Sequence, residues 1–180
     1  GSVIDGRNCY DEQGEEGYRG PHGMFLYRCE GIELQGYTMR DCGNWANTFY
    51  LCQDIDAKGL RFLAGHDGMH FRSCDRVSIE HCEFHSGDDG IAGYDNQDMV
   101  IRDCLISSAC DAMRLGGTDV LVERCRFVGP CRYAHRWKMS DEEHRAGAPS
   151  DPTKHRSNLL YGFLYFCCRN TPIRKTPGNI

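Results

Sequence analysis

Short stretches in which apolar and polar residues alternate recur along the chain at nearly constant spacing. Alternation with a period of two predicts β-strands that each bury one face. The spacing of 21 to 23 residues between strands is typical of solenoids, in which successive coils stack in parallel. The inward positions are Ile32-x-Leu34, Ile55-x-Ala57, Val77-x-Ile79, Met99-x-Ile101 and Val120-x-Val122.

A second set of strands follows an aspartate in three successive repeats, as Met69-x-Phe71, Ile91-x-Gly93 and Met113-x-Leu115. Glycine, aspartate, asparagine and serine separate the strands and indicate turns. Helix-length segments with a period of 3.6 residues are almost absent. The pattern therefore predicts an all-β, right-handed parallel β-helix of about six coils, with about 22 residues and two or three strands in each coil.

We expect a single β-helix domain over residues 1–180, of which Gly1-Ser2 is typical of an expression remnant. Residues 129–158 interrupt the repeat with a polar loop, and loops of this length are usually functional or disordered. An apolar strand is expected at residues 159–166. The end of the chain resembles the start of another coil, and terminal coils need caps. We therefore expect a portion of a longer β-helix, or association with another chain through exposed ends.

Charge and hydropathy narrow the choice of partners. The formal net charge is -5, and acidic and basic residues are interleaved, so no basic stripe for nucleic acid is present. No apolar run approaches the ~20 residues of a membrane span. We expect neither a nucleic-acid nor a membrane partner.

The twelve cysteines follow the same repeat. Buried thiols pack as small apolar groups, and the absence of a CxxC pair argues against a structural zinc site. We therefore expect reduced, unpaired thiols, which favours a cytoplasmic location, with disulfides in a secreted solenoid as the alternative. Two columns are expected, one of Cys29, Cys52 and Cys74 and one of Cys82, Cys104 and Cys125.

Three aspartates, Asp67, Asp89 and Asp111, lie 22 residues apart. In stacked coils they would form a column with about 4.8 Å between neighbours. Carboxylates this close raise one another's pKa, so the column indicates either a metal site or acid–base chemistry. The alternative is that each aspartate caps a turn by accepting hydrogen bonds from backbone amides.

Three segments, Ile4-Asp5-Gly6-Arg7, His66-Asp67-Gly68 and the run Ser86 to Ala92, resemble the polygalacturonase family, glycoside hydrolase family 28. The resemblance implies a parallel β-helix that cleaves pectic polysaccharides by inverting hydrolysis. It places the catalytic aspartates at Asp67, Asp88 and Asp89 and requires no cofactor. Asp88 would be the proton donor, while Asp67 and Asp89 would hold the attacking water.

The chain departs from the family at two motifs. Where the family has Gly-His-Gly, this chain has Cys110-Asp111-Ala112. The family's Arg-x-Lys clamp for the substrate carboxylate is replaced by adjacent residues, Arg174 and Lys175. Neighbours on a strand face opposite ways, so these two cannot both point at one substrate.

Several further residues are candidates for substrate binding. Arg114 would neutralise the aspartates or hold a sugar carboxylate, with a surface salt bridge as the alternative. Trp137 in the long loop would stack on a sugar ring or anchor the loop. The full set of substrate-binding candidates is Asp111, Arg114, His66, His70, Tyr94, Trp137, Arg174 and Lys175.

Calcium offers a competing interpretation, because it favours several carboxylate oxygens and could lie among His66, Asp67, Asp88 and Asp89. The sequence thus predicts a glycoside hydrolase-like protein that acts on a polysaccharide or oligosaccharide, of the pectic type by resemblance. The alternatives are a calcium-dependent lyase or epimerase, and a non-catalytic β-helix that binds glycans or serves as a scaffold, because a fold does not fix a function.

Overall fold

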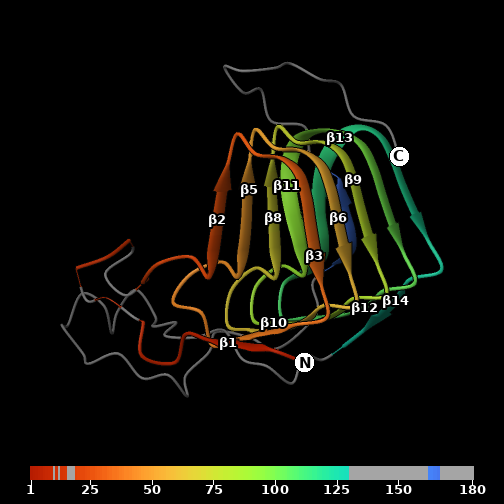
Figure 1. Ribbon diagram of the computed structural model, residues 1–180. Helices are drawn as coiled ribbons and strands as arrows, with labels where there is room; N and C mark the ends of the chain where they lie inside the picture. The colour runs from red at the N-terminus through yellow and green to blue at the C-terminus, as the bar shows by residue number, and fades with distance from the viewer. Residues whose placement is uncertain (10, 12, 16–18, 130–161, 167–180) are drawn as a thin grey trace.

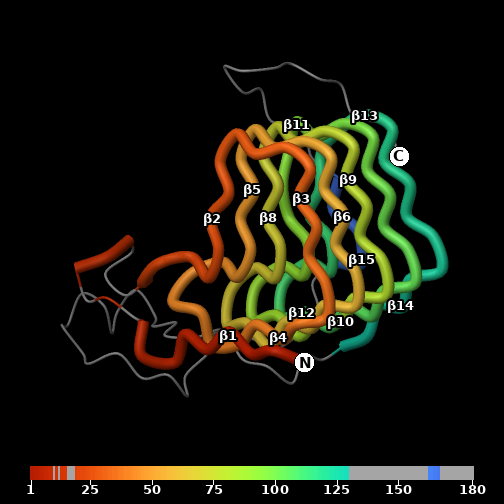
Figure 2. Tube along the Cα trace, in the orientation of Figure 1, coloured from red at the N-terminus to blue at the C-terminus, as the bar shows by residue number. Residues whose placement is uncertain are grey.

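The structure is a computed structural model that describes residues 1–9, 11, 13–15, 19–129 and 162–166. The described chain winds into a parallel β-helix with three strands in each coil (Figure 1). Strands at the same place in successive coils pair in parallel and form three stacks. Figure 2 shows that the coils follow almost the same path, so residues one repeat apart become neighbours.

The first stack contains β2 (Met24–Tyr27), β5 (Asn47–Tyr50), β8 (Met69–Arg72), the starts of β11 (Ile91–Arg102) and β13 (Asp111–Glu123), and β15 (Gly162–Phe166). The second stack contains β3 (Glu30–Gln35), β6 (Gln53–Lys58), β9 (Asp75–Glu80) and the ends of β11 and β13. The third stack contains β1 (Val3–Asp5), β4 (Thr38–Arg40), β7 (Arg61–Ala64), β10 (Glu83–Ser86), β12 (Leu105–Ser108) and β14 (Arg126–Val128).

The register confirms both strand sets expected from the sequence. In the second stack Val77 pairs with Ile55 and Met99, and in the first stack Ile91 pairs with Met69 and Met113. The six strands of the third stack enclose five turns, close to the six coils expected. Within the expected strand at residues 159–166, the described part forms β15.

The core is filled by ladders of side chains that repeat from coil to coil. Phe49 stacks on Phe71 with ring centroids 4.7 Å apart, and Phe62 stacks on Phe84 at 4.9 Å. All four rings are fully buried, so truncating any one to alanine is expected to cost about 3–5 kcal/mol. This rigid core fixes the turns in which the candidate site lies.

All nine described cysteines are free, as the sequence predicts. Thiols in the two expected columns donate hydrogen bonds to carbonyl oxygens of the preceding coil, as Cys74 does to Phe49 at 3.5 Å and Cys104 to Ile79 at 3.7 Å. The thiols therefore fill space and also satisfy backbone acceptors. The other three cysteines of the chain lie outside the described residues.

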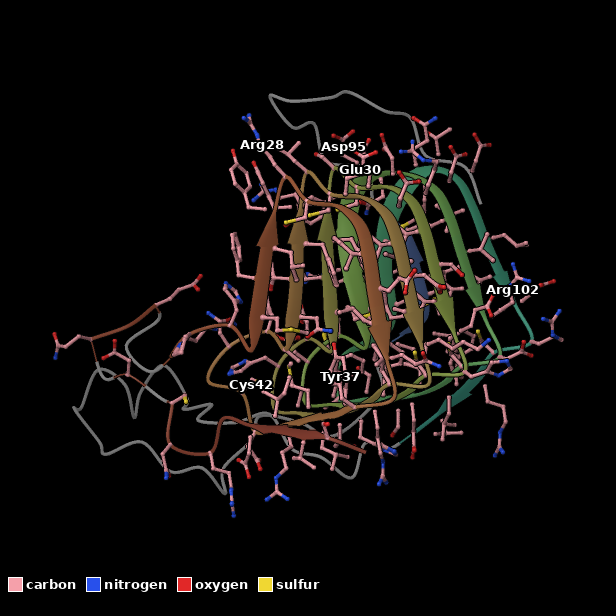
Figure 3. The ribbon with its side chains drawn as sticks, viewed as in Figure 1. Arg28, Glu30, Tyr37, Cys42, Asp95 and Arg102 are labelled. Carbon is pink, nitrogen blue, oxygen red and sulfur yellow. The ribbon has the colours of Figure 1, made fainter. Side chains whose placement is uncertain are left out.

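Figure 3 shows two opposite sides of the coils at which the chain turns. Asp95 and Arg28 mark the end at which the first stack passes into the second, and Cys42 lies at the opposite end. At the Asp95 end, Leu51, Ser73 and Asp95 adopt positive φ angles of 52° to 60° at matching places in successive coils. No helix in the described part of the chain is long and apolar enough to cross a membrane.

Candidate active site

The aspartates lie where the chain passes from the third stack into the first, at residues 65–68, 87–90 and 109–112, the last of which includes the first two residues of β13. We call these the aspartate turns. Backbone hydrogen bonds align them, because Gly68 N–H donates to Asp89 O and Gly90 N–H donates to Asp111 O, both at 3.1 Å. Asp67, Asp89 and Asp111 therefore stand in the column that the 22-residue spacing predicts.

Asp67 is buried, with 1% of its surface exposed, and both of its carboxylate oxygens are engaged. Oδ2 shares a 2.8 Å hydrogen bond with Nδ1 of His70. Oδ1 accepts a 3.2 Å hydrogen bond from the N–H of Asp89, which belongs to the peptide bond that follows Asp88. Burial, assisted by the charge of Asp88, raises the pKa of Asp67 well above its usual value. Asp67 thus fixes the turn that carries Asp88.

Asp89 repeats this arrangement one coil later and is fully buried. Its Oδ1 accepts a 3.1 Å hydrogen bond from the N–H of Asp111, and its Oδ2 forms an ion pair with Nε of Arg114 at 2.7 Å. Burial and the charges of Asp67 and Asp88 raise the pKa of Asp89 to about 8, although Arg114 and the Asp111 amide lower it. The loss of hydration therefore outweighs the attraction of the Arg114 cation and keeps the pKa of Asp89 raised.

Asp88 and Asp111 differ from these two because both are only partly buried. The side chain of Arg114 is 32% exposed and lies beside them. Burial raises the pKa of Asp111, Asp88 raises it further, and Arg114 opposes the change. A group must reach the reacting atoms to transfer a proton. Asp88, Asp111 and Arg114 are therefore the predicted site residues best placed to meet a substrate.

Gly162 of β15, which lies next to β13 in the first stack, pairs with Asp111. A Cβ atom at Gly162 would lie 2.8 Å from Oδ1 of Asp111, a contact that real side chains do not make. The absence of a side chain at Gly162 thus leaves the space that the Asp111 carboxylate occupies.

The outer face of the first stack lies next to the aspartate turns. Arg114 pairs with Ala92, which pairs with His70, so the three residues occupy the same position in successive coils. The small side chain of Ala92 separates the two larger ones. Tyr94 meets the His70 ring edge-on, with centroids 5.8 Å apart, and Arg72 lies over the Tyr94 ring at 5.4 Å. The predicted residues His70, Tyr94 and Arg114 are therefore brought together on this face.

His66 and His70 are both buried, with 0% and 2% of their surfaces exposed. Both rings are therefore shielded from solvent, and His70 bonds the carboxylate of Asp67. Sequence reasoning missed Trp45, which lies one repeat before Asp67 and stacks on His70 with centroids 3.8 Å apart and planes 3° from parallel. Its spacing of 22 residues from Asp67 is the signal that identifies it.

One group of described residues could hold a metal ion, because ligand atoms of Asp88, Asp89 and Cys110 lie within 4.8 Å of one another. Burial and the charge of Asp89 raise the pKa of the Cys110 thiol to about 12, so this soft ligand stays protonated. Asp89 is already paired with a cation, Arg114. Calcium needs six to eight oxygen ligands, so these residues, like the expected set with His66 and Asp67, fit calcium poorly.

Other predicted features lie elsewhere. Trp137, Arg174, Lys175 and nearly all of the expected loop at residues 129–158 fall outside the described residues.

A groove of about 460 Å³ lies on the outer face of the second stack, lined by Glu33, Asp56 and Arg76 among others. It is on a different stack from the aspartates and does not belong to the candidate site.

The comparisons with known proteins address the fold. A family model described as "Right handed beta helix region" matches residues 19–129, more than half of the chain. The match spans the aspartate turns and Trp45. No curated protein and no solved structure matches the chain. The chain therefore belongs to the right-handed β-helix family.

Proposed function

We propose that this protein is a glycoside hydrolase that cleaves a polysaccharide of the pectic type by acid–base chemistry, with Asp88 as the proton donor. The observation that carries the proposal is the position of Asp88, a partly exposed carboxyl on a turn that buried Asp67 holds by a hydrogen bond. A fixed, accessible carboxyl among other carboxylates is what general acid catalysis requires. The resemblance of residues 86–92 to polygalacturonases supports the same role.

A second carboxylate must activate the attacking water. Asp67 and Asp89 are buried, and each accepts a backbone N–H of the next coil. Asp111 is partly exposed and lies one coil and one residue beyond Asp88. A rise of about 4.8 Å per coil and about 3.3 Å per residue places the two Cα atoms about 6 Å apart. The corresponding requirement for inverting hydrolysis is that the two carboxyl groups lie about 6.5–9.5 Å apart, so that a water fits between them.

In this proposal the glycosidic C–O bond breaks as Asp88 gives its proton to the leaving oxygen. The water oxygen bonds to the anomeric carbon from the opposite side, and the water gives a proton to Asp111. Asp67 and Asp89 keep the two turns in place. Arg114, beside both accessible carboxyls, binds a sugar carboxylate or hydroxyl.

The outer face of the first stack supports a sugar chain as the substrate. Tyr27 and Tyr50 stack at 5.5 Å, and Arg72 lies over Tyr50 at 5.6 Å, so phenol and guanidinium groups run along the helix axis towards Tyr94. These groups donate hydrogen bonds to hydroxyls and carboxylates. Arg72 and Arg114 favour an acidic sugar, which agrees with a pectic substrate.

The test is the product formed from a panel of pectic backbones. Hydrolysis releases reducing ends with no new ultraviolet absorbance, whereas a lyase produces an unsaturated product that absorbs. Asp88→Asn is expected to abolish the release, and Asp98→Asn, at an exposed position with a positive φ angle that asparagine tolerates, is the matched control. Retention of the glycan without any product would indicate a binding module instead.

A further inference from the structure

A chain of contacts connects Trp45 to the turn that carries Asp88. We infer that Trp45 is a positioning residue, which holds the His70 imidazole against Asp67 and thereby fixes the turn that carries Asp88. The kinetic part of this inference rests on the proposed function. The structural part concerns the state of His70 and stands without it.

The first contact is the stack of Trp45 on His70. The two ring planes are 3° from parallel and their centroids are 3.8 Å apart, so the indole covers one face of the imidazole. The outer torsion of a histidine side chain has broad, weakly defined minima. The ring orientation is therefore selected by its packing partners, which are Trp45 on the face and Tyr94 at 5.8 Å edge-on.

Two further hydrogen bonds connect the orientation of the His70 ring to the aspartate turn that contains Asp88. Nδ1 of His70 reaches Oδ2 of Asp67 at 2.8 Å only while the ring stays in its plane. Oδ1 of the same carboxylate accepts the N–H of Asp89 at 3.2 Å. That N–H belongs to the peptide bond after Asp88, so rotation of His70 would release the carboxylate that sets the Asp88 backbone.

Trp45 is in turn braced by the segment that precedes β2. Gly23 N–H donates to the Trp45 carbonyl at 3.0 Å, and the His22 ring lies 5.2 Å from the indole. The backbone N–H of Trp45 donates a hydrogen bond to Oδ1 of Asn44, which also accepts a hydrogen bond from Nη1 of Arg19. Residues before the first regular coil are thus connected to Trp45 and through it to the site.

The experiment compares Trp45→Ala with Trp45→Phe by ¹⁵N NMR of the imidazole groups. The intact protein is expected to show one hydrogen-bonded state of His70 Nδ1, distinct from exposed His81, which serves as an internal reference. Trp45→Ala is expected to move the His70 signals towards those of His81, and Trp45→Phe to restore them. Val77→Ala, a truncation in the second stack, controls for general destabilisation.

Kinetics on the same variants supply the second readout. Trp45→Ala is expected to lower kcat by about tenfold to a hundredfold with KM changed by less than about threefold, because small misplacements of a catalytic group have effects of this size. Trp45→Phe should retain most of the activity. His70 signals that are unchanged in Trp45→Ala would overturn the inference, as would an unchanged kcat in an active enzyme. If the intact protein releases no product, the proposed function fails, while the NMR comparison still decides the position of His70.

Discussion

The carboxylate of Asp67 accepts the backbone N–H of Asp89 across the gap between two coils, at 3.2 Å. One coil later the carboxylate of Asp89 accepts the N–H of Asp111 at 3.1 Å. Each buried aspartate therefore holds the turn of the next coil, and its second oxygen faces a basic side chain. This repeated bond makes Asp67 and Asp89 parts of the framework, and in the proposed mechanism Asp88 and Asp111 meet the substrate.

Removing the framework carboxylate of Asp67 is expected to destabilise the protein. In Asp67→Ala the Asp89 N–H and the His70 ring both lose a buried partner, which costs about 1–3 kcal/mol for each group. Asp67→Asn keeps the shape and an acceptor oxygen, so it should be clearly more stable than the alanine variant. Urea unfolding of the two variants provides the comparison, and equal stability would contradict a framework role.

Stability is expected to decrease as the pH rises from about 4 to about 8. Burial raises the pKa of Asp89 from 3.8 to about 8 in the folded state, so the unfolded chain releases this proton at a lower pH than the folded protein. The folded state then binds more protons throughout this window, and each added pH unit lowers the free energy of unfolding by up to about 1.4 kcal/mol per group.

The measurement for this prediction is urea unfolding at several pH values between 4 and 8. Asp89→Asn removes the titrating group and should flatten the dependence. Asp98→Asn, at an exposed position, should leave the slope unchanged. An unfolding free energy that does not fall between pH 4 and pH 8 in the unmodified protein would show that the pKa of Asp89 is not raised in the folded state.

A side chain at Gly162 is expected to impair Asp111. The new Cβ of Gly162→Ala would lie 2.8 Å from Oδ1 of Asp111 and must displace the carboxylate. We expect a loss of about tenfold in kcat/KM, equivalent to about 1.4 kcal/mol. In an Asp111→Asn background the same change should have little further effect, since the two residues act together. Additive losses would show that Gly162 acts elsewhere.

Arg114→Gln is expected to weaken binding of acidic oligosaccharides more than binding of neutral ones. The substitution removes the partly exposed cation beside Asp88 and Asp111, while the neutral Gln can still donate hydrogen bonds to hydroxyl groups. Calorimetric titration of an Asp88→Asn protein, with and without the Arg114 change, measures binding apart from turnover. Equal weakening for both kinds of sugar would argue against a carboxylate site.

The repeat made most of the fold predictable. Two apolar residues per strand, as in Val77-x-Ile79, identify the first and second stacks from spacing alone. The strands of the third stack were not located from the sequence, because they are short and each contributes one large inward apolar residue, such as Met39, Phe62 or Phe84. Where a second inward residue is present it is small or polar, as Ala64 and Ser86 are, so the alternation of apolar residues is weak.

The sequence predicted where the candidate site lies, but it did not predict which aspartates are buried and which are accessible. The 22-residue spacing places Asp67, Asp89 and Asp111 in a column, but burial depends on the path of each turn, which spacing does not encode. Asp88 and Asp89 are adjacent in sequence, yet one is accessible and the other fully buried. Trp45 was overlooked because the aspartate pattern begins only one coil later.

The most direct test is the release of reducing ends from pectic polysaccharides by the unmodified protein and by Asp88→Asn, with Asp98→Asn as the control. Our account predicts release without an unsaturated product by the unmodified and control proteins. Asp88→Asn should lose at least about a hundredfold in rate, as expected for a general acid, while circular dichroism and thermal unfolding show that it folds normally. Equal rates for Asp88→Asn and the unmodified protein would contradict the assignment of Asp88 as the proton donor.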